Sequence, residues 1–228
     1  MSTESKTKIV ALVPMRHDSE RVPGKNYRDM VGKPLYAHIL ATLSKVDLID
    51  QIVVDTDSEI VRSGIRQAFP EVLLLDRPAH LRQGETPMNE VLLHDTEQVP
   101  AEIYLQTHST NPLLGAETVR SAIEEYLAGI PEHDSLFSVT ELRTRLYDAK
   151  GQAINHDPSE LLRTQDLPPV YEENSCIYLF SRETLEKFGH RIGGKPKMFP
   201  IPAEEAQDID EESDFLLVEN ILKMRAGD

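Results

Sequence analysis

Short runs of branched aliphatic residues alternate with longer helical patterns through the first 140 residues, and this alternation constrains the fold more than any other feature. Strands are predicted at 9–13, 51–54, 72–75, 103–106 and 135–140. Helices are predicted between them, at 35–43, 58–69, 88–96 and 116–127. Helices that connect parallel strands cover both faces of a sheet. The pattern therefore predicts a Rossmann-like, three-layer α/β fold with a mostly parallel sheet.

The pattern changes after residue 140. Residues 141–171 contain a predicted hairpin that turns near Lys150-Gly151, followed by a proline-containing stretch. The sheet is expected to resume at 176–180, and a last helix is expected at 212–224. We predict one domain over residues 1–228, with 141–171 as an arm within it. Such an arm can cover a ligand or a second subunit, or it can be a plain surface insertion.

Composition excludes several classes of function. The chain has 39 acidic and 24 basic residues, a net charge of −15, so we expect neither a nucleic-acid binder nor a protein held on anionic lipid. No apolar run approaches the roughly 20 residues that span a bilayer. The one cysteine, Cys176, cannot form an internal disulfide. These features predict a protein of a reducing compartment, the cytoplasm.

The loop after the first strand is rich in cations. Residues 16–26 contain Arg16, Arg21 and Lys25, with a glycine, Gly24, that permits a positive φ. Ligands of open α/β sheets bind beyond the carboxyl ends of the strands, and arginine, lysine and backbone amides together suit a polyphosphate. The loop is not a Walker A motif, because Asn26 follows Lys25 where serine or threonine is required. A solvated charged loop is the alternative interpretation.

Two carboxylates precede the last helix. Asp208 and Asp210 are two residues apart, so in an extended segment they project to the same side and can hold one Mg²⁺ ion. The alternative is that Asp210 caps the helix. A triphosphate site needs both cations and a metal, so the distant cationic loop favours the first interpretation.

Other polar positions have weaker functional interpretations. Asp55 follows a strand and is similar to the nucleophile of haloacid-dehalogenase-type phosphatases, although helix capping by Asp57 or Ser58 is the better explanation of this segment. His108 lies beyond a predicted strand end, where it can contact a ligand or stabilise a turn. Cys176 lies in an apolar strand and is predicted to be core.

Five segments in order along the chain share the motifs of one family. They are Arg16-x-x-Ser19-x-Arg21-x-Pro23-x-Lys25-Asn26; Arg77-Pro78-Ala79 with Leu81 and Thr86; Leu105-Gln106 with Ser109-Thr110-Asn111-Pro112-Leu113; Leu167-Pro168 with Tyr171, Asn174 and Ile177-Tyr178; and Asp208-Ile209-Asp210. Together they resemble the cytidylyltransferases that activate acidic sugars, above all the acylneuraminate (CMP-sialic acid) synthetases, which are related to the CMP-Kdo synthetases. The resemblance covers nearly the whole chain.

The resemblance implies a nucleotidyltransferase fold and a Mg²⁺-dependent reaction. CTP and an acidic 2-keto sugar would give a CMP-sugar and pyrophosphate, in a homodimer whose arm is residues 141–171. The implied site residues fall into four groups: Arg16, Arg21 and Lys25 in catalysis; Arg16, Ser19, Lys25, Asn26, Arg77 and Thr86 on the nucleotide; Gln106, Arg163 and Asn174 on the sugar; Asp208 and Asp210 on the metal.

Several positions depart from the family pattern. Glu20 stands where the family usually has lysine, which bears on how tightly the loop holds phosphate. The other departures fall mostly on the sugar side and leave the acceptor open: Glu172 where sialic acid synthetases often have arginine, Ser175 where a glycine is expected, and His108 and Asn111 within the third motif. Kdo, a legionaminic- or pseudaminic-type sugar and a phosphonate remain alternatives to a sialic acid. Glu20 also motivates a non-catalytic alternative, a nucleotide-sugar binding protein on the same scaffold. A phosphatase that uses Asp55 ranks last.

Overall fold

The computed structural model describes residues 7–227. A seven-stranded sheet has the order β5-β4-β1-β6-β8-β7-β9. Its strands are β1 (Ile9–Leu12), β4 (Gln51–Thr56), β5 (Leu73–Asp76), β6 (Ile103–Gln106), β7 (Ser135–Leu142), β8 (Val170–Phe180) and β9 (Pro196–Pro200). Only β8 runs antiparallel to its neighbours, β6 and β7. The mostly parallel α/β sheet predicted from the sequence is confirmed.

Helices cover both faces of this sheet. The helices are α1 (Leu35–Leu43), α2 (Glu59–Ala68), α3 (Met88–Gln98), α4 (Ala116–Gly129), α5 (Arg182–Phe188) and α6 (Glu212–Ala226). The side chains of α1, α2 and α4 pack with Ile9, Ala11 and Val54 in the larger core. Those of α3 and α5 pack with Val10 and Leu12 on the opposite face. Successive residues of a strand point to opposite faces, so the buried run of β1 serves both cores.

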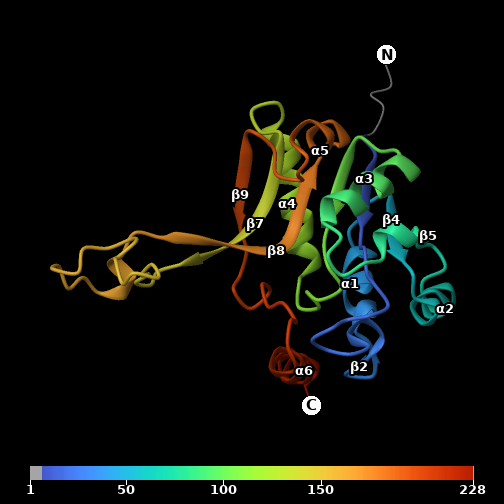
Figure 1. Ribbon diagram of the computed structural model, residues 1–228, viewed down its shortest axis with the longest axis horizontal. Coiled ribbons are helices and arrows are strands. Elements are labelled where there is room, and N and C mark those ends of the chain that lie inside the picture. Colours follow the sequence, from blue (N-terminus) through green and yellow to red (C-terminus); the bar gives the residue numbers. More distant parts are fainter. Residues whose placement is uncertain (1–6, 228) are drawn as a thin grey trace.

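A third apolar cluster lies away from the two sheet faces. It joins Val22 of the loop after β1 to Ile209 and to Phe215 and Val218 of α6. The short strands β2 (Asp29–Met30) and β3 (Lys33–Pro34) form a separate two-stranded sheet, and Met30 belongs to the same cluster. Figure 1 shows α6 at the same end of the molecule as β2. The cluster therefore brings the C-terminal segment against the N-terminal loop.

Residues between β7 and β8 form a long projection away from the body (Figure 1). Its hairpin turns at Asp148–Gln152, and Tyr147 pairs with Ala153. The short helices η1 (Lys25–Tyr27), η2 (Ala79–Leu81) and η3 (Thr164–Asp166) complete the secondary structure, with η3 on this projection. Across residues 7–227, no helix has the length and apolar content needed to cross a bilayer.

Most predicted strands shift by one or two residues at an end, and two strands of the large sheet differ more from the prediction. β8 begins at Val170 rather than Cys176, because its first residues pair with β7 beyond the core, where the polar sequence carries no strand pattern. β9 was not predicted; proline stands at both of its ends, which disguises an edge strand. Cys176 is buried in β8, as predicted, and burial raises the pKa of its thiol.

Candidate active site

The cationic loop after β1 is folded tightly around Gly24. This glycine has φ 67°, and a Cβ placed on it would lie 2.8 Å from the ring of Tyr27. The Lys25 N–H donates to the Val22 carbonyl at 3.1 Å, and the Tyr27 N–H to the Gly24 carbonyl at 3.1 Å. The left-handed backbone predicted at Gly24 is confirmed, and it turns Lys25 inward, where only 9% of the residue is exposed.

Hydrogen bonds from neighbouring segments hold this loop. Backbone N–H of Met15 donates to the Asp55 carbonyl at 2.9 Å, and that of His17 donates to the Asp57 carboxylate at 2.7 Å. The Asn26 amide donates to the Arg16 carbonyl at 2.7 Å and accepts from the Ser109 hydroxyl at 2.7 Å. Both ends of the Asn26 amide are thus used within the protein, so this side chain fixes the loop.

The segment before α6 lies directly against the loop. The buried Ile209 donates its N–H to the Thr110 carbonyl at 3.1 Å, and its own carbonyl accepts from the Lys25 ammonium. The Arg21 guanidinium lies 2.6 Å from the Asp210 carboxylate. The convergence of N-terminal cations and C-terminal carboxylates that the sequence predicts is therefore observed.

These segments surround an open cavity of about 430 Å³. Seven of the predicted site residues line it: Arg16, Ser19, Arg21, Lys25, Asn26, Asp208 and Asp210. His108, for which the sequence analysis left a ligand contact or a turn open, lines it as well. The sequence analysis did not assign eight others to the site: Pro14, Met15, Asp18, Glu20, Gly84, Ser109, Thr110 and Ser175. Residues 108–110 directly follow β6, and this position at a strand end was the available signal for them.

Burial and charge set the protonation of the cavity's central groups. Burial lowers the pKa of Lys25, and the nearby Asp208 and Asp210 partly offset this effect. Loss of solvent around the Asp208 carboxylate raises its pKa, Asp210 raises it further, and Thr110 and Lys25 act in the opposite direction. Two mutually repelling carboxylates with a hydroxyl beside them are hard oxygen donors, so this donor set fits a Mg²⁺ ion.

Asp210 is not the cap of α6. The N-cap is Glu211, which forms a capping box with Asp214. The Asp214 carboxylate accepts backbone N–H groups from Asp210 at 3.0 Å and from Glu211 at 2.8 Å. The capping alternative for Asp210 is therefore wrong, and its carboxylate faces the cavity and Arg21 instead.

His108 lines the cavity as a neutral ring. Burial, together with the positive charges of Arg191 and Lys25, lowers its pKa to about 3. The Gln106 amide nitrogen lies 3.0 Å from both the Thr107 carbonyl and the Nε2 atom of His108. Because the amide donates to the carbonyl, it also donates to Nε2, and the ring proton is then assigned to Nδ1. Gln106 itself is fully buried beneath the cavity.

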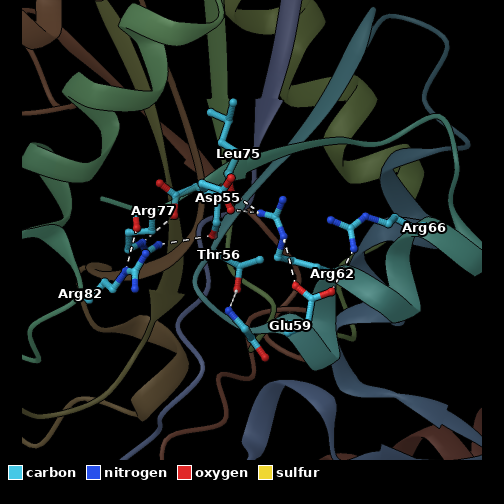
Figure 2. A network of polar contacts seen from close by, with 10 residues as sticks. Asp55, Thr56, Glu59, Arg62, Arg66, Leu75, Arg77 and Arg82 are labelled. Atoms are coloured by element: carbon cyan, nitrogen blue, oxygen red, sulfur yellow. Dashed lines mark hydrogen bonds and ion pairs between the residues drawn. The ribbon is translucent and has the colours of Figure 1, made fainter. Parts of the chain in front are cut away.

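Arg77 does not line the cavity, contrary to the expectation for a nucleotide ligand. It is 2% exposed, and its Nε donates to the Asp55 carboxylate at 2.5 Å (Figure 2). Arg82 Nε donates to the Arg77 carbonyl at 2.8 Å within the same network. Asp55 is 1% exposed and paired, so it cannot serve as a phosphatase nucleophile. The expected helix cap is confirmed at Ser58, whose hydroxyl accepts the Val61 N–H.

Thr86 also lies outside the lining of this cavity, although its loop reaches the cavity through Gly84. A Cβ placed on Gly84 would lie 2.6 Å from the Glu20 carboxylate and 3.3 Å from the Arg16 guanidinium. The segment after β5 therefore forms one wall of the cavity by close approach of its backbone.

A second cavity of about 440 Å³ adjoins the first and shares Ser175, Asp208 and Asp210 with it. Its other lining residues are Glu172, Glu173, Asn174, Ala206 and Gln207. Asn174 accepts from the Ser138 hydroxyl at 2.6 Å and donates to the Thr140 hydroxyl at 3.1 Å, which joins β8 to β7 at their register shift. Arg163 lies on the arm, where it pairs with Asp166 at 2.7 Å, outside both cavities.

Comparison with known proteins gives consistent matches. A family model described as cytidylyltransferase matches residues 10–220. The chain is 28% identical over 204 residues to the 3-deoxy-manno-octulosonate cytidylyltransferase of Chlorobium phaeobacteroides (strain BS1), covering 83% of this chain and 79% of that protein. It is 26% identical over 220 residues to the N-acylneuraminate cytidylyltransferase of Streptococcus agalactiae serotype III (strain NEM316), covering 92% of this chain but 52% of that protein. This chain therefore spans about half the length of the streptococcal relative.

Among solved structures, a CMP:2-keto-3-deoxy-manno-octonic acid synthetase complexed with CTP superposes with a TM-score of 0.70. The identity is 16%, and the superposition covers 96% of this chain and 100% of the other. At that identity the likeness shows the shared fold. The family match, in contrast, spans the loop after β1, both cavities and the Asp208–Asp210 segment.

Proposed function

Because this chain belongs to the cytidylyltransferase family, we propose that it transfers the cytidylyl group of CTP to a hydroxyl of an acidic 2-keto sugar of the sialic acid type. The observation that carries the proposal is the meeting of Arg16, Arg21 and Lys25 with Asp208 and Asp210 in one cavity. The acceptor oxygen would attack the α-phosphorus, and the bond from that phosphorus to the bridging oxygen would break. Pyrophosphate leaves, and the hydroxyl proton is lost.

The three cations explain how a chain with a net charge of −15 could bind a triphosphate. Two unit charges about 4 Å apart interact by roughly 4 kcal/mol at an effective dielectric constant near 20, so a few well-placed cations outweigh distant carboxylates. Burial lowers the pKa of Lys25, and an anion entering the cavity would favour its charged form. Arg16, Arg21 and Lys25 would then offset the charge that builds on the phosphate oxygens during transfer.

Asp208 and Asp210 would hold Mg²⁺, which supplies positive charge to the phosphates when bound. Asp210 also pairs with Arg21 at 2.6 Å, so a side chain that would hold the metal lies beside one that would contact the phosphates. The pair joins the loop after β1 to the segment before α6.

The second cavity suits the acceptor, because it shares Ser175 and both aspartates with the first. Glu172 and Glu173 also line it, so an acidic acceptor requires a positive charge from elsewhere. Arg163 lies on the arm, outside the cavities of its own chain, and its predicted contact with the sugar therefore requires a second subunit. We propose a homodimer in which the arm supplies that contact.

The test is pyrophosphate release from CTP and Mg²⁺ with a panel of acceptors. The panel contains N-acetylneuraminate, Kdo, legionaminic- and pseudaminic-type acids, and a phosphonate. Lys25→Ala is expected to lower turnover by a few orders of magnitude while the protein stays folded, because it removes a buried cation from the phosphate site. Lys45→Ala is the matched control, since Lys45 is exposed and lies outside both cavities.

Silence across the panel, together with no binding of CTP by calorimetry, would exclude the transferase. Glu20, which lines the cavity, favours one alternative: a protein that binds nucleotide sugars without turnover. Detection of a CMP-sugar product by mass spectrometry decides against that alternative, and binding without product decides for it.

A further inference from the structure

Two carboxyl groups and one guanidinium are buried together next to the active-site cavity. Asp55 at the end of β4, Arg77 after β5 and Asp95 on α3 are each at most 2% exposed. The Arg77 guanidinium bonds to Asp55 Oδ1. Among the described residues, Asp55 Oδ2 and both carboxyl oxygens of Asp95 have no hydrogen-bond partner when the carboxyls are taken as ionised. Buried polar atoms of native proteins are rarely left in that state.

The net charge of Asp55, Arg77 and Asp95 indicates that one proton is bound among them. With both carboxyls ionised, Arg77 leaves a net charge of −1 in the interior, which is costly. Burial raises the pKa of Asp95, and the neighbouring Asp55 raises it further, to about 9. A protonated Asp95 would be neutral, so the cluster would carry no net charge. Its O–H would donate a hydrogen bond to the Asp55 carboxylate and so give a partner to a buried oxygen of each residue.

A bound divalent metal ion would neutralise the charge of this cluster less well than a bound proton. Ligand atoms of Asp55, His94 and Asp95 lie within 4.8 Å of one another, a spacing that a divalent cation could use. With Arg77 beside them, such an ion would leave a net charge of +1, whereas a proton leaves none. The charged and titratable groups that face Asp95 in the described structure are Asp55 from β4, Arg77 from the segment after β5 and His94 on its own helix.

The cluster is connected to two walls of the cavity. The Asp55 carbonyl accepts the N–H of Met15, which opens the cationic loop. The Arg77 carbonyl accepts from Arg82, and the chain then reaches Gly84, which lies against Glu20 and Arg16. The two residues of the Asp55–Arg77 pair are therefore hydrogen-bonded to both segments that form these walls.

We propose that Asp95 is a positioning residue that works as a neutral acid: its carboxyl O–H donates to Asp55 and holds the Asp55–Arg77 pair, and through it the two loops, in the geometry that binds the triphosphate. The role in catalysis rests on the proposed function, whereas the protonation of Asp95 does not. The two are therefore tested by separate measurements.

The first measurement is folding stability against pH, by chemical denaturation, for wild type and Asp95→Asn. A folded-state pKa near 9, above the ordinary value of 3.8, means that the folded protein keeps a proton that the unfolded chain releases. This difference lowers stability as pH rises from about 4 to about 9. Asparagine keeps a donor and cannot ionise. The folding equilibrium constant of wild type should therefore fall relative to that of Asp95→Asn, by up to tenfold per pH unit.

Parallel stability curves for the two proteins would overturn the proposal, whether or not any acceptor is turned over. Stoichiometric divalent metal in the purified wild type that is absent from Asp95→Asn would also overturn it, in favour of a metal site. Metal content is measured by plasma mass spectrometry.

The second measurement is kcat and KM for CTP across pH 6–10. Asp95→Asn should keep wild-type kinetics at pH 7 and extend them to higher pH, while Asp95→Leu, which is branched at the same carbon and has no donor, should lower kcat/KM at least tenfold. Equal losses in both variants would overturn the positioning role. If Asp95→Leu does not fold, the activity of Asp95→Asn at the alkaline end of the pH range tests the positioning role. The role is rejected if activity falls with rising pH in this variant as it does in wild type.

Discussion

Ser175 lies on the rim shared by the two cavities with a backbone that favours glycine. Its φ is 59°, and its hydroxyl accepts a hydrogen bond from Tyr178 at 3.2 Å. A side chain in the left-handed region costs roughly 1–2 kcal/mol, which explains why the family pattern has glycine at this position. The serine keeps this strained conformation beside Asn174, where β8 changes its register with β7.

We expect Ser175→Gly to be more stable than Ser175→Ala by about 0.5–1 kcal/mol, in denaturant unfolding at pH 7. Both variants lose the hydroxyl, so the difference between their unfolding free energies reports the strain of a Cβ at this φ. The greater freedom of glycine in the unfolded chain offsets part of that strain. Equal stability of the two variants would mean that the backbone relaxes at no cost.

At the scale of single residues, the sequence predicted which loop brings cations to the cavity better than it predicted which carboxylate each cation pairs with. Arg16 and Lys25 follow the first strand, and the topology alone places that loop at the ligand edge. Arg77 also follows a strand, but its guanidinium turns inward to Asp55, 22 residues earlier. Arg77 turns inward because the neighbouring strand places a buried carboxylate next to it in the sheet register. Neither composition nor residue spacing predicts that register.

The N-terminus of α6 holds the carboxylate segment through its cap. Asp214 accepts the backbone N–H groups of both Asp210 and Glu211, so one side chain supports both the start of the helix and the proposed metal site. Asp214→Ala is expected to cost about 1 kcal/mol of unfolding free energy, because it removes the Asp214 half of the capping box. It should also lower turnover, because Asp210 loses its backbone support.

The matched control is Asp214→Asn, which keeps an oxygen acceptor and should retain most of the stability and turnover. Thermal unfolding and pyrophosphate release measure the two effects. Full activity of Asp214→Ala would show that the position of Asp210 in the cavity does not depend on Asp214.

Among the elements, the buried parallel strands were the most predictable. Their branched aliphatic runs are needed on both faces, as the two cores on either side of β1 show. The missed elements lie where burial is one-sided or absent. The outer half of β8 is exposed, and β9 is an edge strand bounded by Pro196 and Pro200. Neither carries the pattern that marks a central strand.

For the whole molecule, the exposed apolar residues of the arm argue for association. Tyr147, Ile154 and Leu161 are 52%, 62% and 94% exposed. We expect light scattering to give a mass near twice the 25.8 kDa of the chain. The double variant Ile154→Asp/Leu161→Asp should be monomeric, because burying two carboxylates in an interface is costly.

Leu217→Asp is the control, since Leu217 is 51% exposed on α6, outside the arm. It should leave the mass unchanged. A wild-type protein that is monomeric at micromolar concentration would reject the proposed homodimer and, with it, the contact between Arg163 and the acceptor of a second subunit.

The meeting of the cationic loop with the carboxylate segment was predicted from what a triphosphate site needs and from the family resemblance, and not from any local pattern. No local pattern links Val22 to Ile209, although their apolar contact with Phe215 is what holds the carboxylates beside the cations. Arg28 reinforces this contact, with two hydrogen bonds to Glu212 and its guanidinium 4.0 Å from the Phe215 ring centroid.

The continuity of β8 has a consequence for protein engineering. Its eleven residues run without a break from the arm at Val170, past Ser175, to Phe180 in the middle of the sheet. A chimera that takes only the projecting hairpin from this protein would cut the strand within the second cavity, which we propose holds the acceptor. A functional transplant must therefore carry both strands and the Asn174 bridge as one cassette, with its boundaries inside the host sheet.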